Sequence, residues 1–402
     1  MNQKIEMVQP VKKSSKPYPL DFINAGTAKK VQDFHKSFPM YKETPLVSMN
    51  ALAKVLGLSG IFVKDESYRF DLNTFKVLGG SYAIGNYMAN KLGMDIGELP
   101  YEKMISGEVK RQLGELTFVT ATDGNHGRGV AWTASRLKQK AVVYMPKGSS
   151  IERLENIRAE GAEASIQELN YDEAARLADS MAKKHGWILV QDTAWEGYTD
   201  IPTWIIQGYS TMGWEAYERL PEKPTHIFLQ AGVGSMAGAV TGLFADIYGT
   251  DRPIVTIVEP NKADCLYRTA KADDGKLHFV TGDMNTIMAG LACGEPCSIA
   301  WELLRDYVDF FISCPDFVAA KGMRIMASPP PGDSRIISGE SGAATLGCVA
   351  EIMLNESYKA LRKMLKLDEK SKVLFFSTEG DTDRENYRVI VWDGKEPSYR
   401  NY

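Results

Sequence analysis

Cysteine is scarce in this sequence, and dense blocks of basic residues are missing. Five cysteines occur among 402 residues, none in a CxxC pair, which argues against a disulfide scaffold and against a cysteine-bound metal. The 47 basic and 51 acidic side chains give a formal net charge of −4, which favours neither nucleic acid nor an anionic membrane as the partner. We therefore expect a cytoplasmic protein with reduced thiols that acts on a small molecule.

Long apolar runs are also few. The charge-free stretch 227–245 is long enough on paper to span a bilayer. It contains Gln230 and several glycines, however, and divides into a β-rich half and a half of small residues. It predicts a buried strand, loop and helix. The first 19 residues carry charges and no apolar segment, so we expect a polar arm and no signal peptide.

What the sequence does contain is a repeated alternation of short β-branched runs with longer helical ones. Helical spacing occurs at 151–161, 171–186 and 205–220. Strands are predicted at 60–67, 116–121, 140–146, 187–192, 225–231, 253–260 and 372–380. This order is typical of an α/β chain with parallel strands, and the length predicts about two domains. Ligands of such sheets bind beyond the carboxyl ends of the strands. The turn-rich segment 260–300 is interpreted as an ordinary surface loop rather than as a flap over a site.

The first candidate site residue is Lys76, in the segment NTFKVLGG. It follows a predicted strand, and Asn73 or Thr74 would cap a helix whose first turn contains it. The helix dipole opposes a cation there and favours the neutral amine that a Schiff-base lysine needs. A solvated surface lysine is the competing interpretation.

The second candidate is the TDGNHG segment, residues 122–127, between a predicted strand and a helix. Free N–H groups at the helix start would bind a carboxylate. Asp123 is an acceptor when ionised and would repel a carboxylate unless the substrate also carries a positive charge. The segment thus points to an acid with two amino groups. Asp123 as a plain helix cap, with His126 as a packing residue, is the alternative.

The third candidate is a glycine-rich turn between a strand and a helix. It consists of Gly232, Val233, Gly234, Ser235 and Met236. Glycine allows close backbone approach, and successive N–H groups with the helix dipole hold a phosphate. The turn matches neither GxGxxG nor a P-loop, so a plain strand-to-helix turn is the alternative.

Hydroxyl and carboxyl groups follow two further strands. Ser377 or Thr378 would pair with a ring nitrogen, or would only satisfy local backbone groups. Asp192 ends another predicted strand. Acidic residues are common in loops, so Asp192 by itself does not indicate a function.

In combination and in order, these segments resemble the fold-type II pyridoxal-phosphate enzymes over roughly residues 40–390. The resemblance implies an α/β fold of two domains, each with a mainly parallel sheet flanked by helices, and an active site in the cleft between them. The large cofactor-binding domain would comprise residues 1–88 and 200–402, and the small mobile domain residues 89–199.

The resemblance also implies roles for individual residues. Lys76 would carry pyridoxal 5′-phosphate, and Gly232–Met236 would hold its phosphate. Asn125 would face the 3-hydroxyl of the cofactor, and Ser377 or Thr378 its ring nitrogen N1. The substrate carboxylate would bind the loop that contains Thr122, Gly124, Asn125 and His126.

Asp123 narrows the resemblance, because most relatives have serine or threonine at this position. With KDES, QDTAWEGY and AGVGSMAGAV, the TDGNHG segment looks like that of the diaminopropionate ammonia-lyases. This implies cleavage of 2,3-diaminopropionate, with Asp123 and Asp192 holding its β-ammonium. Lys76 would be the base for the L isomer and Asp123 for the D isomer. The resemblance further implies a homodimer and a disulfide between Cys265 and Cys293.

Two alternatives stay open. A serine or threonine dehydratase would use the same lysine with a hydroxyl leaving group, which gives no reason for a carboxylate at position 123. A non-catalytic protein that binds pyridoxal phosphate would keep Lys76 but would leave Asp123 and Asp192 without a role.

Overall fold

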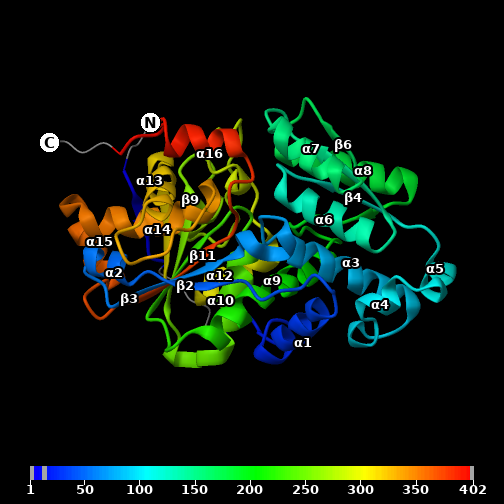
Figure 1. Ribbon diagram of the computed structural model, residues 1–402, viewed down its shortest axis with the longest axis horizontal. Helices are drawn as coiled ribbons and strands as arrows, with labels where there is room; N and C mark the ends of the chain where they lie inside the picture. Colours follow the sequence, from blue (N-terminus) through cyan, green and yellow to red (C-terminus); the bar gives the residue numbers. More distant parts are fainter. Residues whose placement is uncertain (1–3, 11–15, 399–402) are drawn as a thin grey trace.

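The computed structural model describes residues 4–10 and 16–398, which form two sheets (Figure 1). The larger sheet has seven strands in the order β1-β10-β9-β8-β11-β3-β2, and the smaller has four in the order β6-β5-β4-β7. The strands of the larger sheet are β1 Glu6–Val8, β2 Leu46–Ser48, β3 Gly60–Asp65, β8 His226–Gln230, β9 Ile254–Pro260, β10 Phe310–Cys314 and β11 Lys372–Ser377. Those of the smaller sheet are β4 Thr117–Ala121, β5 Lys140–Met145, β6 Glu163–Ile166 and β7 Ile188–Leu189.

Neighbouring strands are parallel in both sheets except at the two edges of the larger one. β10, β9, β8, β11 and β3 pair in parallel, as do all pairs of the smaller sheet. The edge strands β1 and β2 are antiparallel to their neighbours. The expected α/β architecture is confirmed, and the carboxyl ends of the central strands point to one side.

Helices cover both faces of the larger sheet because its central strands are apolar on both faces. In β8, Ile227 and Leu229 belong to one core together with residues of α1, α3, α9, α10 and α12. Phe228, between them, belongs to a second core with residues of α2, α13, α14 and α16. These helices and their neighbours are α1 Ala25–Lys36, α2 Asn50–Leu56, α3 Val77–Leu92, α9 Asp200–Arg219, α10 Ser235–Tyr248, α11 Cys265–Ala272, α12 Ser298–Tyr307, α13 Asp316–Ala327, α14 Glu340–Leu354, α15 Lys359–Leu365 and α16 Arg384–Val391.

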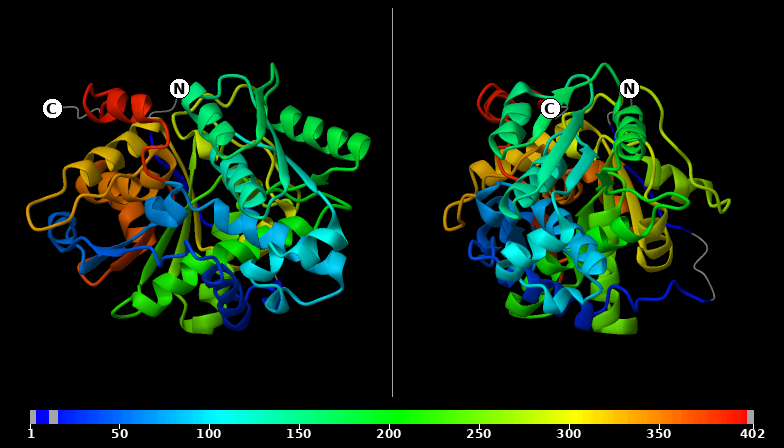
Figure 2. Two further views of the ribbon diagram at one scale, coloured as in Figure 1. Left: turned by 45° about the vertical axis from the view of Figure 1, so that its right-hand side comes forward. Right: turned by 90° about the vertical axis from the view of Figure 1, so that its right-hand side faces the viewer.

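The smaller sheet and its helices lie at one end of the molecule, and helices α13, α14 and α15 lie at the other end (Figures 1 and 2). Helix α8 packs on one face of this sheet through Ala174 and Ala178, and α6 and α7 share the core of α3 on the other face. The helices of this region are α4 Tyr101–Met104, α5 Gly107–Leu113, α6 Asn125–Arg136, α7 Ile151–Ala159 and α8 Tyr171–His185. The four-stranded sheet thus lies within residues 89–199, while the domain limits themselves stay a prediction.

All seven predicted strands and the three predicted helices are present, with shifted ends. Four strands were not predicted. Of these, β1 and β2 have only three residues each, and such short segments are extended because they pair with a neighbour. The prediction of a polar N-terminal arm is therefore partly wrong, because residues 6–8 form an edge strand of the larger sheet and Ile5 is buried. Residues 1–3 and 11–15 of that arm lie outside the described part.

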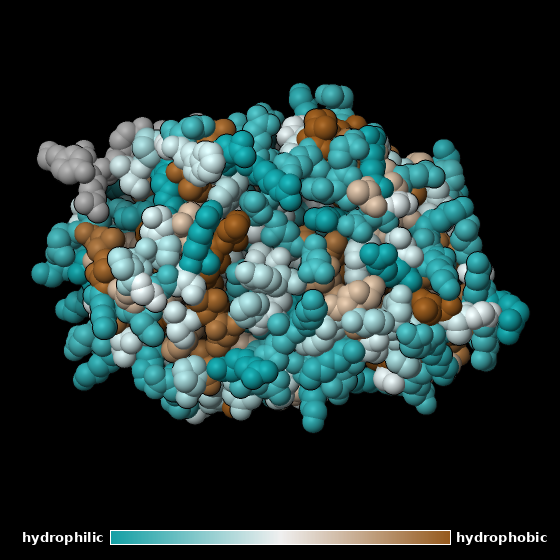
Figure 3. All heavy atoms as spheres, in the orientation of Figure 1, coloured by the Kyte–Doolittle hydropathy of each residue, from teal (hydrophilic) through white to brown (hydrophobic). Residues whose placement is uncertain are grey.

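The charge-free stretch 227–245 forms β8, a loop and α10 inside the core, as predicted. Within residues 4–10 and 16–398, no helix is both long and apolar enough to cross a membrane. The face shown in Figure 3 is largely hydrophilic, and its hydrophobic residues form small patches between hydrophilic ones.

Candidate active site

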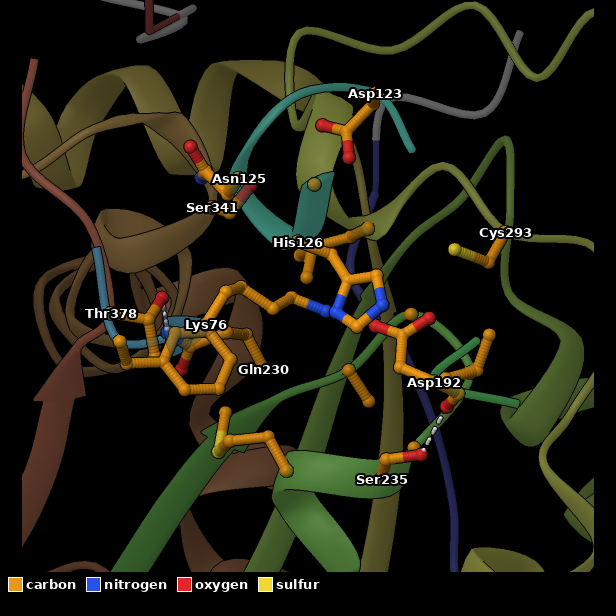
Figure 4. A pocket seen from close by; sticks show the side chains of 18 of the residues that line it. Lys76, Asp123, Asn125, His126, Asp192, Gln230, Ser235, Cys293, Ser341 and Thr378 are labelled. Atoms are coloured by element: carbon orange, nitrogen blue, oxygen red, sulfur yellow. Dashed lines mark hydrogen bonds and ion pairs between the residues drawn. The ribbon is translucent and has the colours of Figure 1, made fainter. Parts of the chain in front are cut away.

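A cavity lies where the carboxyl ends of strands from both sheets meet (Figure 4). The loops that follow β4, β8 and β11 contribute lining residues, as does the start of α3. Of the catalytic, cofactor-binding and substrate-binding residues predicted from the sequence, all but Ser377 and Gly124 line this cavity: Lys76, Thr122, Asp123, Asn125, His126, Asp192, Gly232, Val233, Gly234, Ser235, Met236 and Thr378. Segments up to 300 residues apart in the chain therefore meet at one place, because parallel strands deliver their carboxyl ends to one edge.

Lys76 is held at the start of α3 by an irregular turn. Asn73, three residues earlier, has a φ of 60°, and Lys76 itself occupies the N-cap position of α3, whose first residue is Val77. The prediction of a side-chain cap by Asn73 or Thr74 is wrong, since no side chain caps this helix. The Lys76 amine lies over the rings of Phe75 and Tyr209, at 5.5 and 5.9 Å from their centroids.

The charge of Lys76 is set by Asp192. Lys76 Nζ donates to Asp192 Oδ2 at 2.5 Å. Burial alone would lower the pKa of the Lys76 amine, but the neighbouring carboxylate raises this pKa above its ordinary value. The expected neutral amine is therefore wrong for this arrangement, because a contacting carboxylate acts more strongly than the helix dipole.

Asp192 is anchored by residues of two helices that are far apart in the sequence, α8 and α10. Tyr171, the first residue of α8, donates its hydroxyl to Asp192 Oδ1 at 3.2 Å, and Ser235 Oγ at the start of α10 donates to the Asp192 carbonyl at 2.7 Å. Burial would raise the pKa of the Asp192 carboxyl group, but the Lys76 ammonium holds it below its ordinary value. Asp192 is thus a buried, ionised acceptor of fixed orientation.

The loop after β4 presents polar groups from a backbone that only glycine allows. Gly124 has a φ of 155°, and a Cβ there would lie 2.8 Å from Arg153 Cδ. Helix α6 begins at Asn125, whose amide donates to the Glu379 carboxyl group. His126 Nε2 donates to the Val190 carbonyl at 2.7 Å, and its buried Nδ1 has no hydrogen-bond partner among the described residues. Burial lowers the pKa of His126, so the ring is a neutral acceptor toward the cavity.

Asp123 is not the N-cap of α6, since Gly124 takes that position without a side-chain cap. Its Oδ2 instead accepts from Arg153 Nη1 at 3.3 Å, and Arg153 Nη2 lies 3.9 Å from Glu340 Oε2. Burial raises the pKa of Asp123, against the effect of Arg153. Asp123 is a quarter exposed, so it lies nearer to solvent than Asp192.

The glycine-rich turn lies close against residues 290–293 and lines the cavity with backbone groups. Gly234 has a φ of 99°, and a Cβ on Gly232 would lie 3.1 Å from Cys293 Sγ and 3.3 Å from Leu291 Cα. Helix α10 begins at Ser235, and the first N–H groups of a helix have no partner within it. The turn is therefore a concave donor surface suited to an anion.

Of the two hydroxyls after β11, only one faces the cavity. Thr378 lines it, whereas Ser377 Oγ donates to Ser338 Oγ at 2.9 Å. Thr378 Oγ1 accepts from Gln230 Nε2 at 2.8 Å. The alternation of side chains along an extended chain separates the two neighbours.

Several lining residues were missed in the sequence. Glu379 follows Thr378 directly, and Gln230 precedes the glycine-rich turn, so their adjacency to predicted site residues was an available signal. Tyr171 and Ser341 gave none, because they are the first and the second residue of two ordinary helices, α8 and α14. The interpretation of 260–300 as a plain surface loop is wrong, since Gly290, Leu291 and Cys293 line the cavity.

The five cysteines are free and buried in the described part of the chain. The implied disulfide between Cys265 and Cys293 is therefore not present. Both thiols lie beside Gly232, and burial raises the pKa of each. The described residues also contain no cluster of potential metal ligands.

The chain was compared with known proteins. A family model described as pyridoxal-phosphate dependent enzyme matches residues 38–379. The diaminopropionate ammonia-lyase of Salmonella typhimurium is 54% identical over 381 residues, 94% of each chain, and that of Escherichia coli is 51% identical over 377 residues, 93% of each. A crystal structure of the holo enzyme from Escherichia coli superposes with a TM-score of 0.93 at 46% identity and covers 100% of both chains. The chain therefore belongs to the pyridoxal-phosphate-dependent enzyme family that includes the diaminopropionate ammonia-lyases.

Proposed function

We propose that this protein eliminates ammonia from 2,3-diaminopropionate and, with one water, releases pyruvate and two ammonia molecules. The single observation that carries the substrate is the charge of the cavity. Its lining includes three carboxyl side chains, Asp123, Asp192 and Glu379, and one basic side chain, Lys76. Such an excess of acidic groups suits an amino acid with a second ammonium. The high identity to diaminopropionate ammonia-lyases supports the same substrate.

The lining residues fit pyridoxal phosphate. The glycine-rich turn lines the cavity, and the N–H groups at the start of α10, which have no partner within the helix, can hold an anionic phosphate there. Lys76 lines the same cavity as this turn, and its side chain extends toward Asp192 (Figure 4). Asn125 and Thr378 offer polar groups to the edge of a ring. When bound, the cofactor supplies an electron sink for the carbanion that remains after loss of the α-proton.

We assign Lys76 as the residue that binds the cofactor covalently and as the base that takes the α-proton of the L isomer at Nζ. Asp192 accepts from Lys76 in the structure. Because its pKa is depressed, it stays ionised and can hold an ammonium group in place of the lysine. Held as an ammonium, the β-nitrogen leaves as neutral ammonia, which is a far better leaving group than an amide ion.

Asp123 is assigned as the second partner of the β-ammonium and as the base for the D isomer. It comes from the loop after β4, and its carboxyl group is held by Arg153 rather than by Lys76. The raised pKa of Asp123 is in the direction that a general base requires. Thr122 is assigned to the substrate carboxylate through its hydroxyl, and Asn125 and His126 through the backbone N–H groups at the start of α6. Gly124 lies outside the cavity lining and keeps only a role in shaping the loop. The Asn125 side chain is assigned to the edge of the cofactor ring.

Three further assignments concern the location of the protein, its oligomeric state and its domains. We propose a cytoplasmic location, because all five cysteines are free and buried. We propose a homodimer by resemblance to the family, to be tested by light scattering on the purified protein. We also propose that residues 89–199 move as a small domain against residues 1–88 and 200–402. Helix α3 crosses the limit at residue 88, so it would act as the connection.

The test of function is turnover by the purified holoenzyme with L- and D-2,3-diaminopropionate, serine and threonine. Pyruvate and ammonia are expected in a ratio of one to two with either isomer of diaminopropionate. A strong preference for serine or threonine would establish the dehydratase instead. Cofactor binding without any pyruvate release would establish a non-catalytic binding protein.

Lys76→Ala is expected to abolish turnover and the absorbance of covalently bound cofactor, because no other lysine lines the cavity in the described residues. Lys262→Ala, a lysine outside the cavity, is the matched control and keeps both. Retention of covalent cofactor by the Lys76 variant would contradict the assignment.

Asp123→Asn is expected to reduce turnover of the D isomer by about 10²-fold or more, the typical contribution of a general base, and turnover of the L isomer less. The ratio of kcat for the D isomer to kcat for the L isomer, compared between wild type and variant, shows whether Asp123 serves as the base for the D isomer only. Equal losses with both isomers would assign Asp123 to binding alone.

A further inference from the structure

Gln230 is a buried side chain next to the site that the proposed mechanism does not use. It is the last residue of β8 and is 1% exposed. Its Nε2 donates to the Phe376 carbonyl and to Thr378 Oγ1, both at 2.8 Å. Strands β8 and β11 are parallel neighbours, so the sheet brings Gln230 and Thr378 together at their carboxyl ends.

The orientation of this amide is fixed by its surroundings. Phe376 offers a carbonyl oxygen, which only accepts. Turning the amide over would place Oε1 against that carbonyl and would leave both N–H groups of the amide without an acceptor. The observed orientation satisfies both N–H groups and leaves only Oε1 without a partner. Gln230 therefore acts as a donor toward Thr378.

This donor determines what Thr378 can offer the cavity. A hydroxyl has one hydrogen to donate. Within the described residues, the Gln230 amide is the hydrogen-bond partner found for Thr378 Oγ1. The amide occupies an acceptor position of that oxygen, so the hydroxyl hydrogen is available to the cavity. The nearby Glu379 carboxyl group accepts from Ser341 N and from the Asn125 amide, and no contact joins it to the Thr378 hydroxyl.

We propose that Gln230 is a positioning residue that makes Thr378 a hydrogen-bond donor toward the pyridine nitrogen of the cofactor and thereby keeps that nitrogen unprotonated. The inference rests on the proposed cofactor and adds a residue to its control. A donor facing the ring nitrogen is compatible with the free lone pair and is unfavourable for N–H⁺, because two donors would then oppose each other. An unprotonated ring withdraws electrons less and shortens the life of the carbanion before the β-nitrogen leaves.

The experiment uses holoenzyme reconstituted with pyridoxal phosphate labelled with ¹⁵N in the ring, without substrate. The ¹⁵N chemical shift reports protonation of that nitrogen directly and does not depend on turnover. The wild type is expected to show the unprotonated position across the pH range in which it stays folded. The titratable side chains that line the cavity and share this environment are Lys76, Asp123, His126, Tyr171, Asp192, Cys293 and Glu379.

Gln230→Glu reverses the hydrogen bond. When ionised, its carboxylate accepts from Thr378. When protonated, its one O–H is taken by the Phe376 carbonyl, which only accepts, so the carboxyl group still accepts from Thr378. In both states the Thr378 hydroxyl turns a lone pair to the ring, and the ¹⁵N resonance should move toward the protonated position. Gln207→Glu is the matched control, since Gln207 Nε2 also donates to a carbonyl, of Phe22, at 2.8 Å but lies outside the cavity lining. This control should leave the resonance unchanged.

Gln230→Met removes both donors at similar size and serves if Gln230→Glu does not fold. The dissociation constant of the cofactor should rise about fivefold, as for one neutral hydrogen bond, and this effect should vanish in a Thr378→Val background. A protonated ring in the wild type, or equal effects of Gln230→Met with and without the Thr378 hydroxyl, would overturn the proposal. Either of these two results would leave the proposed function intact, because pyruvate release is measured separately. A purified protein that binds no pyridoxal phosphate would instead refute the proposed cofactor.

Discussion

At the scale of single residues, the structure makes Lys76 and Asp192 one unit. Each sets the protonation state of the other, since the carboxylate raises the pKa of the amine and the ammonium lowers that of the acid. The lysine must lose a proton before it can act as a nucleophile or a base. A substrate that brings its own ammonium to Asp192 would release the lysine from this pair, which couples substrate charge to catalysis.

Asp192→Asn is expected to lower the pKa of the Lys76 amine by about 1–3 units, the usual effect of removing one contacting opposite charge. The pKa is measured on cofactor-free protein from the pH dependence of Lys76 acylation, followed by mass spectrometry. Asp172→Asn is the control, because Asp172 neighbours Tyr171 but is not a partner of Lys76. An unchanged pKa in the Asp192 variant would show that burial, not the ion pair, governs the amine.

At the scale of elements, a buried ionic network ties the segment before Lys76 to α9. Lys64 on β3 and Arg69, in the short helix Glu66–Asp71, both donate to Glu215 Oε2 on α9, at 2.6 and 2.7 Å. Arg69 Nε also donates to Glu66 at 2.9 Å. All four side chains are fully buried. Because Tyr209 on the same α9 contacts the Lys76 amine, the network also fixes the ring over which that amine lies.

Glu215→Gln is expected to reduce the free energy of unfolding by about 3–5 kcal/mol, since it leaves buried cations without their shared carboxylate. Urea unfolding followed by circular dichroism measures the loss. Glu43→Gln is the control, because its pair with Arg219 is largely exposed and should be worth less than about 1 kcal/mol. Similar losses in the two variants would argue that the buried network contributes little net stability.

At the scale of the whole molecule, the core tolerates neutral polar groups but not new charges. His35 on α1 is fully buried, and its ring contacts Thr211 on α9 and the Leu78 carbonyl on α3 at 2.8 and 3.1 Å. Burial lowers the pKa of His35 from 6.5 to about 3. The folded protein therefore excludes a proton that the unfolded chain binds below pH 6.5.

Stability should consequently fall as pH decreases from 6.5 toward 3. Each pH unit in this window removes up to about 1.4 kcal/mol through this group, because the unfolded state binds the additional proton. His35→Gln removes this contribution, so the difference in unfolding free energy between wild type and variant should shrink with decreasing pH. His185→Gln, at an exposed position, controls for loss of an imidazole. A pH-independent difference for His35→Gln would contradict a buried neutral histidine.

The amino-acid sequence alone determined the class of the protein and most of its site. Alternating apolar runs predicted the α/β elements, and polar or glycine-rich segments after strands predicted Lys76, residues 122–126, Asp192, Gly232–Met236 and either Ser377 or Thr378, because parallel strands end at a shared edge. Tertiary structure alone decided which groups face each other. The pairing of Lys76 with Asp192, of Asp123 with Arg153 and of Thr378 with Gln230 joins residues 30 to 148 positions apart. Local pattern cannot encode such contacts, since charge and hydrogen-bond polarity depend on distances that exist only after both sheets have packed.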